Sequence, residues 1–237
     1  MMKKFKAIFF DLDDTLCDWQ GAKLYGLKAA HTMVAMHHPE FTFDIWKKEF
    51  DQVSIQMFSE WSKFTRPSSE LRLERTRRIF ARLGINGQET LADSATDTFF
   101  AHAIENLQLF DDVNDVLSRL HPNFVLGIIT NTLADVQRIK IHKLGLDEKI
   151  HHVLIASEVG VSKPSPEIFH RALELAKVDA EEFLFVGNSL EDDVAGARAA
   201  GVPVAWLNRP GASLPDGIQP TFVMHTLRDL LPITVQA

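Results

Sequence analysis

Beyond Asp111, short apolar segments alternate with amphipathic helical segments along the chain. The apolar segments are expected to be strands, and they cover residues 124–129, 153–156, 183–186 and 202–206. Helices are expected at residues 113–120, 133–144, 166–177 and 190–200. Such alternation favours a parallel sheet with helices on both faces. The apolar run at residues 7–10 reads as another buried strand of the same sheet.

Residues 18–106 carry no strand signal, and their apolar residues recur at helical spacing. Helices are expected at residues 19–36, 43–64, 70–83 and 88–106. Because one strand precedes this block and the others follow it, the block is an insertion. The expected fold class is α/β, a Rossmann-like doubly wound parallel sheet with an inserted all-helical cap. The core would comprise residues 1–17 and 107–237, and the cap residues 18–106 would select the substrate.

Two carboxylates, Asp11 and Asp13, directly follow the first strand. Ligands of α/β sheets bind just beyond the carboxyl ends of the strands, so both acids would lie where a substrate binds. One carboxylate can attack phosphorus to form an aspartyl-phosphate, and a second can move the proton. Because two such acids repel each other, a divalent cation is the expected partner. The alternative is a solvated turn in which Asp13 or Asp14 caps the next helix.

Polar side chains also follow later strands. Thr130 and Asn131 end the strand at 124–129, where they can bind phosphoryl oxygens or simply cap the next helix. Lys163 precedes Pro164, which favours an extended backbone that can aim the ammonium at a phosphate. The alternative for Lys163 is a solvated surface position.

The loop after residues 183–186 carries Asn188, Asp192 and Asp193. Amide and carboxylate oxygens suit Mg²⁺, which takes few protein ligands and several waters. Asp193 is favoured over Asp192 because it immediately precedes the small residues 194–197 that would pack the helix. The alternative is an acidic first helical turn stabilised by the helix dipole.

Taken in order, these four segments resemble the motifs of the haloacid dehalogenase (HAD) superfamily, in the subfamily with a helical cap between its first and second motifs. The resemblance runs from Phe5 to about Trp206. The general layout is similar to the N-acylneuraminate-9-phosphatases and house-cleaning nucleotidases. The family usually has Gly-Asp where this chain has Gly187-Asn188, which replaces a charged ligand with a neutral amide.

The resemblance implies a Mg²⁺-dependent enzyme that hydrolyses a small phosphate monoester, either a sugar phosphate or a nucleoside monophosphate. Asp11 would be the nucleophile and Asp13 the general acid and base. The phosphoryl oxygens would be held by Thr130, Asn131 and Lys163. The metal would be bound by Asp11, Asp13, Asn188 and Asp193.

Three alternatives remain open from the sequence. A phosphomutase would keep all of these residues, and a non-catalytic binding protein would account for Asn188 as a sign of lost activity. A dehalogenase is disfavoured, because dehalogenases lack an acid two residues after the nucleophile. In the cap, Arg66 lies in a break between helices and is the candidate substrate contact, whereas residues 72–78 favour a solvated arginine-rich face.

Net charge and cysteine content restrict the partners. The net charge is −7 and the basic residues are dispersed, which argues against a nucleic-acid surface. The single cysteine, Cys17, excludes an internal disulfide and fits a reducing compartment. No apolar stretch is long enough for a bilayer, so no membrane partner is expected. We expect a cytoplasmic monomer or homodimer.

Overall fold

The computed structural model describes residues 5–215 and 217–235. The chain divides into two compact units, one formed by Met1–Asp18 with Leu109–Ala237 and the other by Trp19–Gln108. We call the first unit the core and the second the cap. Residues 1–4, which the sequence assigns to the core, lie outside the described residues.

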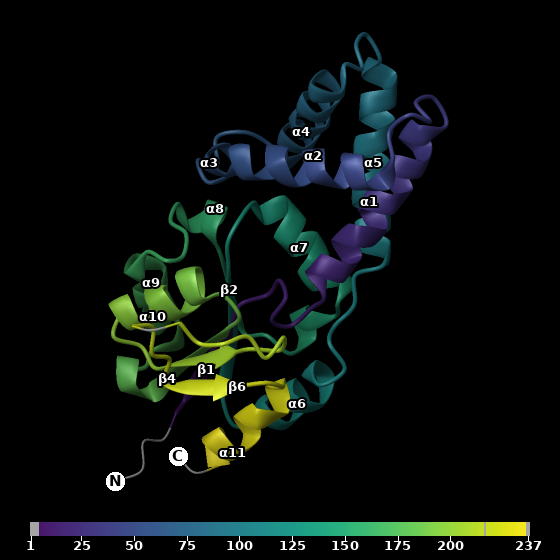
Figure 1. Ribbon diagram of the computed structural model, residues 1–237. Helices are drawn as coiled ribbons and strands as arrows, with labels where there is room; N and C mark the ends of the chain where they lie inside the picture. Colours follow the sequence, from purple (N-terminus) through teal and green to yellow (C-terminus); the bar gives the residue numbers. More distant parts are fainter. Residues whose placement is uncertain (1–4, 216, 236–237) are drawn as a thin grey trace. The chain divides into compact units, whose positions relative to one another are not determined.

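The core contains a six-stranded parallel sheet in the order β3-β2-β1-β4-β5-β6 (Figure 1). Its strands are β1 (Ala7–Phe10), β2 (Val125–Thr130), β3 (His152–Ile155), β4 (Phe183–Gly187), β5 (Val204–Leu207) and β6 (Phe222–Met224). Central β1 pairs with β2 and β4, and all four of its residues are buried, as befits a strand covered on both faces. The predicted α/β fold class is confirmed.

Helices flank this sheet (Figure 1). They are α6 (Val113–Leu120), α7 (Ala134–Lys143), α8 (Ala156–Val159), α9 (Pro166–Ala176), α10 (Ala195–Ala199) and α11 (Leu230–Val235). The helix expected at 190–200 is α-helical only in its second half, because Leu190–Val194 form a π-helix. The three-residue β6 and its partly exposed side chains gave no alternating pattern that would predict a strand.

An aromatic layer fixes the position of β1 in the sheet. The Phe9 ring packs edge-on against Phe183 with 4.8 Å between ring centroids. It also fills the space beside Gly127 of β2, where an added Cβ would lie 2.0 Å from Phe9 Cε1. Glycine at 127 is therefore required by close approach to the Phe9 ring, which lies two residues before Asp11.

The cap is all-helical and comprises α1 (Trp19–Ala35), α2 (Phe43–Gln56), α3 (Phe58–Trp61), α4 (Ser68–Leu83) and α5 (Glu89–Glu105). Gly26 lets α1 approach α5 closely, since an added Cβ would lie 2.3 Å from the Phe99 carbonyl oxygen. The single helix expected at 43–64 is wrong. It is interrupted at Met57, and Phe64 has a φ of 54°, which a right-handed helix does not accommodate.

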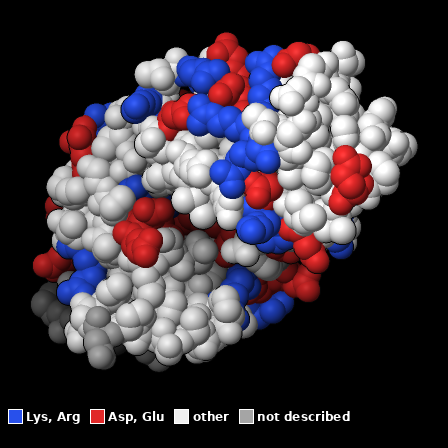
Figure 2. All heavy atoms as spheres, turned by 45° about the horizontal axis from the view of Figure 1, so that its top comes forward, with Lys and Arg blue, Asp and Glu red and all other residues white. Residues whose placement is uncertain are grey.

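Arginines of the cap are paired mainly with nearby acids, and Figure 2 shows basic and acidic side chains interspersed on the face in view. Arg66 Nε lies 3.4 Å from Glu70 Oε2, and Arg66 Nη1 lies 3.8 Å from Glu60 Oε2. Arg75 differs from the expected solvated face, because its guanidinium stacks 4.1 Å from the Phe50 ring centroid. Burial lowers the pKa of Arg75 to about 9.

Across the described ranges, none of the helices combines the length and apolar character needed to cross a bilayer. The cytoplasmic location expected from the sequence stays a prediction.

We expect Gly127→Ala to lower the free energy of unfolding by about 3 kcal/mol, because the new methyl group overlaps the Phe9 ring. Urea denaturation would measure the change, with Ser118→Ala at an exposed position of α6 as the control. If the overlap is the cause, adding Phe9→Leu should make the double variant more stable than the sum of the single effects predicts. Additive losses would contradict this explanation.

Candidate active site

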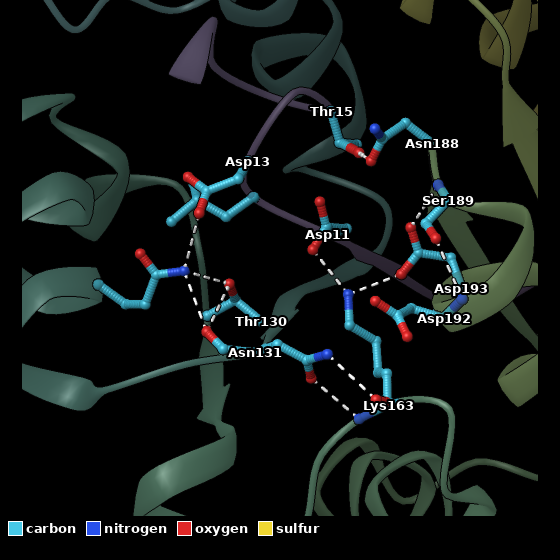
Figure 3. Close-up of polar contacts among 12 residues, drawn as sticks. Asp11, Asp13, Thr15, Thr130, Asn131, Lys163, Asn188, Ser189, Asp192 and Asp193 are labelled. Atoms are coloured by element: carbon cyan, nitrogen blue, oxygen red, sulfur yellow. Dashed lines mark hydrogen bonds and ion pairs between the residues drawn. The ribbon is translucent and has the colours of Figure 1, made fainter. Parts of the chain in front are cut away.

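Three neighbouring strands bring the predicted site residues to one edge of the sheet. Asp11 follows β1, Asn131 follows β2, and Asn188 follows β4 (Figure 3). A cavity of about 160 Å³ opens at this edge. Every residue that lines it has a polar or charged side chain, and the lining consists of Asp11, Asp13, Thr130, Asn131, Thr132, Gln137, Lys163, Asn188, Ser189, Asp192 and Asp193. The carboxyl ends of parallel strands are where α/β proteins bind ligands.

Lys163 lies between two carboxylates (Figure 3). Its Nζ is 2.6 Å from Asp11 Oδ1 and 2.6 Å from Asp193 Oδ1, and the residue is only 4% exposed. Burial alone would lower the pKa of Lys163, but Asp11 and Asp193 raise it above its usual value. These two carboxylates therefore favour the charged ammonium, which has three N–H donors and keeps one beyond these two bonds.

Asp11 is held by the sheet and is itself nearly buried. Its backbone N–H donates to the Val186 carbonyl at 2.9 Å. Burial raises the pKa of Asp11 from 3.8 to about 7, with Lys163 lowering it and the nearby Asp193 raising it further. A further positive charge beside Asp11 would favour the ionised carboxylate that a nucleophile needs.

Asn131 clamps the backbone of Lys163. Its Nδ2 donates to the Lys163 carbonyl at 3.1 Å, and its Oδ1 accepts from the Lys163 N–H at 2.9 Å. This pair of bonds fixes the residue before the cis peptide bond at Pro164. The geometry thus gives Asn131 a structural contact with Lys163, and its predicted contact with a phosphoryl oxygen stays a prediction.

Asp13 faces α7 instead of Lys163. Lys140 Nζ donates to both carboxylate oxygens of Asp13 at 2.9 and 2.8 Å, and Gln137 Nε2 donates to one of them at 3.1 Å. Gln137 also donates to Thr130 Oγ1 at 2.6 Å. The two acids of the first motif therefore have separate cationic partners.

Neither Gln137 nor Lys140 was predicted as a site residue from the sequence. They are three residues apart, so they lie on the same face of a helix. Both are buried on α7 together with Ile141. In the sequence, this pattern of one apolar and two polar residues is typical of a solvent-exposed helix face. No nearby residue indicates that Gln137 and Lys140 are buried against Asp13.

The loop after β4 fixes its own acids. Asp193 is 1% exposed and uses both oxygens, one with Lys163 and the other with the Ser189 N–H at 2.9 Å. An alanine Cβ at Gly187 would lie 2.3 Å from Asp193 Oδ2, so the glycine makes room for this carboxylate. Asp192 lines the cavity, and burial raises its pKa. The predicted preference for Asp193 as metal support therefore stays a prediction.

Asn188 Oδ1 accepts a hydrogen bond from Thr15 Oγ1 at 3.1 Å. Its backbone carbonyl accepts from Trp206 Nε1 at 2.9 Å. Thr15 therefore holds the side-chain amide oxygen, and Trp206 of β5 holds the backbone of the same residue. Because amide and carboxylate oxygens are ligands for Mg²⁺, Asn188 and Asp11 provide suitable donors.

The donor set fits Mg²⁺ better than a metal that prefers many protein ligands. Among residues 5–215 and 217–235, no three His, Cys, Asp or Glu side chains form a metal-binding group. A site of one carboxylate and one amide oxygen leaves most positions to water, which is usual for Mg²⁺.

The loop that follows Asp13 is supported from behind by Arg209. Arg209 Nη2 donates to the Thr15 carbonyl at 3.2 Å, and the guanidinium makes a two-bond pair with Asp112 at 2.9 and 3.0 Å. The Leu227 N–H also donates to Asp112 at 2.7 Å. This supporting role was not predicted from the sequence, because the partners Thr15 and Asp112 lie far from Arg209 along the chain.

Comparison with known proteins gives the class. The chain matches the haloacid dehalogenase-like hydrolase family over residues 5–201 and belongs to that family. It is an enzyme of the HAD type, and the predicted resemblance is confirmed.

Its relatives include phosphatases. Pyrimidine 5'-nucleotidase YjjG of Escherichia coli is 28% identical and is matched over 96% of each chain. N-acylneuraminate-9-phosphatase of Mus musculus is 26% identical, over 97% of this chain and 93% of the relative.

Solved structures share the fold over almost the whole chain. HAD-hydrolase YfnB of Bacillus subtilis bound to magnesium has a TM-score of 0.76 at 24% identity, covering 98% of this chain and 99% of that one. A 2-haloacid dehalogenase from Pseudomonas syringae pv. Tomato has a TM-score of 0.74 at 29% identity, with the same coverage.

Asp112→Asn should lower the free energy of unfolding at neutral pH by about 3 kcal/mol, because it breaks a buried ion pair. Burial would raise the pKa of Asp112, but hydrogen bonds from Arg209 and Leu227 outweigh it and lower the pKa below 3.8. The stabilisation is therefore complete above pH 3.8 and is lost as pH falls through the lower folded-state pKa.

Urea denaturation of wild type and variant across a pH series from about 7 to about 3 would measure this dependence. The control is Asp115→Asn, whose exposed pair with Arg119 should contribute less than about 1 kcal/mol. A difference between wild type and Asp112→Asn that stays constant over the series would contradict the assignment.

Proposed function

We propose that this protein is a phosphatase that hydrolyses a small-molecule phosphate monoester through an aspartyl-phosphate on Asp11. The observation that carries the proposal is the pair Asp11 and Asp13 at one cavity, each with its own buried lysine. Such a pair can serve nucleophilic attack and proton transfer separately. The phosphatases among the relatives support the same reaction class.

In the proposed reaction, the Asp11 oxygen that Lys163 does not bind attacks phosphorus. A bond forms between that oxygen and phosphorus as the bond from phosphorus to the ester oxygen breaks. Asp13 gives its proton to the departing ester oxygen. Asp13 then takes a proton from water, whose oxygen attacks phosphorus and frees Asp11.

Lys163 contributes positive charge near the transferred group. Two of its three N–H donors bind Asp11 and Asp193, and the third is available to a phosphoryl oxygen. A fixed charge at such a position stabilises a transition state without rearrangement. Thr130 and Asn131 line the same cavity and are proposed as further contacts.

Mg²⁺ is the proposed cofactor, and when bound it would neutralise phosphate charge and orient the ester. Asp11, the Asp13 main-chain carbonyl and Asn188 are the residues that would hold it, with Asp193 in support. Asn188 supplies no charge, so Asp11 is the only one of the three direct ligands proposed here that is anionic.

The main competing activity is dehalogenation, because one structural neighbour, at 29% identity, is a 2-haloacid dehalogenase. Asp13 argues against it, because a halide leaves without a proton and needs no acid beside the nucleophile. A phosphomutase or a non-catalytic binding protein on the same fold remains the alternative outcome of the assay. Sugar phosphates and nucleoside monophosphates are the proposed substrate classes, with Arg66 as a proposed cap contact.

Release of inorganic phosphate from a panel of esters, with Mg²⁺ and with EDTA, tests the proposal. The panel contains p-nitrophenyl phosphate, hexose and sialic acid phosphates, and nucleoside monophosphates. A parallel assay measures chloride release from 2-chloropropionate. Metal-dependent phosphate release supports the phosphatase; chloride release without phosphate release would make the protein a dehalogenase.

Asp11→Asn should reduce phosphate release on the order of 10⁴-fold or more, because a neutral amide replaces the carboxylate that attacks phosphorus. Asp147→Asn changes an exposed residue of the same structural unit. It is the matched control and should keep full activity. Circular dichroism should be unchanged in both variants. An active and folded Asp11→Asn protein would rule out the aspartyl-phosphate.

A further inference from the structure

Lys140 lies behind the cavity and does not line it. It is 2% exposed, yet its ammonium lies 2.9 and 2.8 Å from the two oxygens of Asp13. Burying a charged side chain is costly unless a partner compensates for lost water. Asp13 is such a partner, and it borders the cavity while Lys140 does not.

Gln137 ties the same carboxylate to the sheet. Its Nε2 donates to Asp13 Oδ2 at 3.1 Å, to Thr130 Oγ1 at 2.6 Å and to the Asn131 carbonyl at 3.1 Å. Three acceptors around one nitrogen define which end of the amide faces Asp13. Its Oε1 is buried with no hydrogen-bond partner among the described residues, which further indicates that the Nε2 contacts determine the orientation.

The two acids are thus held in different ways. Asp11 shares Lys163 with Asp193, whereas both oxygens of Asp13 are bound from α7 by Lys140. A carboxylate bound at both oxygens by one ammonium has a fixed orientation. Proton transfer depends on placing the acid within hydrogen-bond reach of the ester oxygen, so this orientation matters for the reaction.

We propose that Lys140, assisted by Gln137, is a positioning residue that orients Asp13 for proton transfer to the leaving group. This inference rests on the proposed phosphatase function and deepens it. The proton passes from Asp13 to the ester oxygen and later from water to Asp13. Lys140 keeps its protons throughout and contacts neither the ester nor the phosphorus.

The test compares two esters that differ in how much the leaving oxygen needs a proton. Phenyl phosphate has a poor leaving group and 2,4-dinitrophenyl phosphate a good one. The parameter is kcat/KM, which reports the steps up to formation of the aspartyl-phosphate. We expect Lys140→Met to lose at least about 10-fold more activity on phenyl phosphate than on the dinitrophenyl ester.

Three further variants define the cause of that loss. Lys140→Arg retains a cation that can bind both oxygens and should recover most of the activity on phenyl phosphate. Gln137→Met should show the same substrate dependence with a smaller loss. Lys143→Met changes an exposed lysine on the same helix and should behave as wild type. Equal losses on both esters, or an arginine variant no better than methionine, would overturn the proposal.

Crystal structures of wild type and Lys140→Met give a readout that does not depend on activity. We expect the Asp13 side chain to leave its position beside α7 in the variant while Asp11 and Lys163 stay paired. An unchanged Asp13 would overturn the positioning role. A wild type that hydrolyses neither ester would count against the phosphatase function instead, and the crystal structures would still decide the role of Lys140.

Discussion

The ion pairs of Lys163 with Asp11 and Asp193 hold the site together. They join the end of β1 and the π-helix that follows β4 to the turn before α9. Asn131 fixes the backbone that carries this lysine, and Gly187 leaves room for Asp193. A buried lysine between two buried acids tolerates little displacement, because an unpaired charge there would be strongly destabilising. The geometry of the cavity therefore depends on this arrangement, because Asp11, Lys163 and Asp193 all line it.

Most strands of the core could be predicted from the sequence, because a buried parallel strand is a short apolar run that a polar segment follows. Asp11, Thr130 and Asn188 were predicted as site residues in this way, and Lys163 was predicted from the proline that follows it. Gln137, Lys140 and Arg209 were missed because their significance depends on partners more than 90 residues away. The π-helix at Leu190–Val194 and the break at Met57 were missed too, since apolar spacing continues through both. Local sequence patterns show which residues end the strands. They do not show which side chains from distant parts of the chain contact those residues.

Separate lysines for Asp11 and Asp13 have a chemical rationale. Two acids two residues apart would otherwise share one environment and compete for the same cation. Here burial and Asp193 raise the pKa of Asp11 to about 7, while Asp13 is bound to a different helix. Asn188 removes one negative charge from the same loop cluster, which lessens repulsion around Asp11. The same substitution leaves the proposed metal fewer charged ligands, so the balance of charge at this edge differs from the usual family pattern.

The central place of β1 determines when the site can exist at all. Ala7 pairs with Val125 on one side and with Phe183 on the other, so the strand that carries Asp11 acquires its neighbours only from distant parts of the chain. Contacts of such sequence separation form late and slowly in folding. During synthesis, Asp11 would leave the ribosome well before Asn131, Lys163 and Asp193, so its contacts could form only after those later segments had been made. Activity of this chain therefore requires that β1 has paired with both β2 and β4.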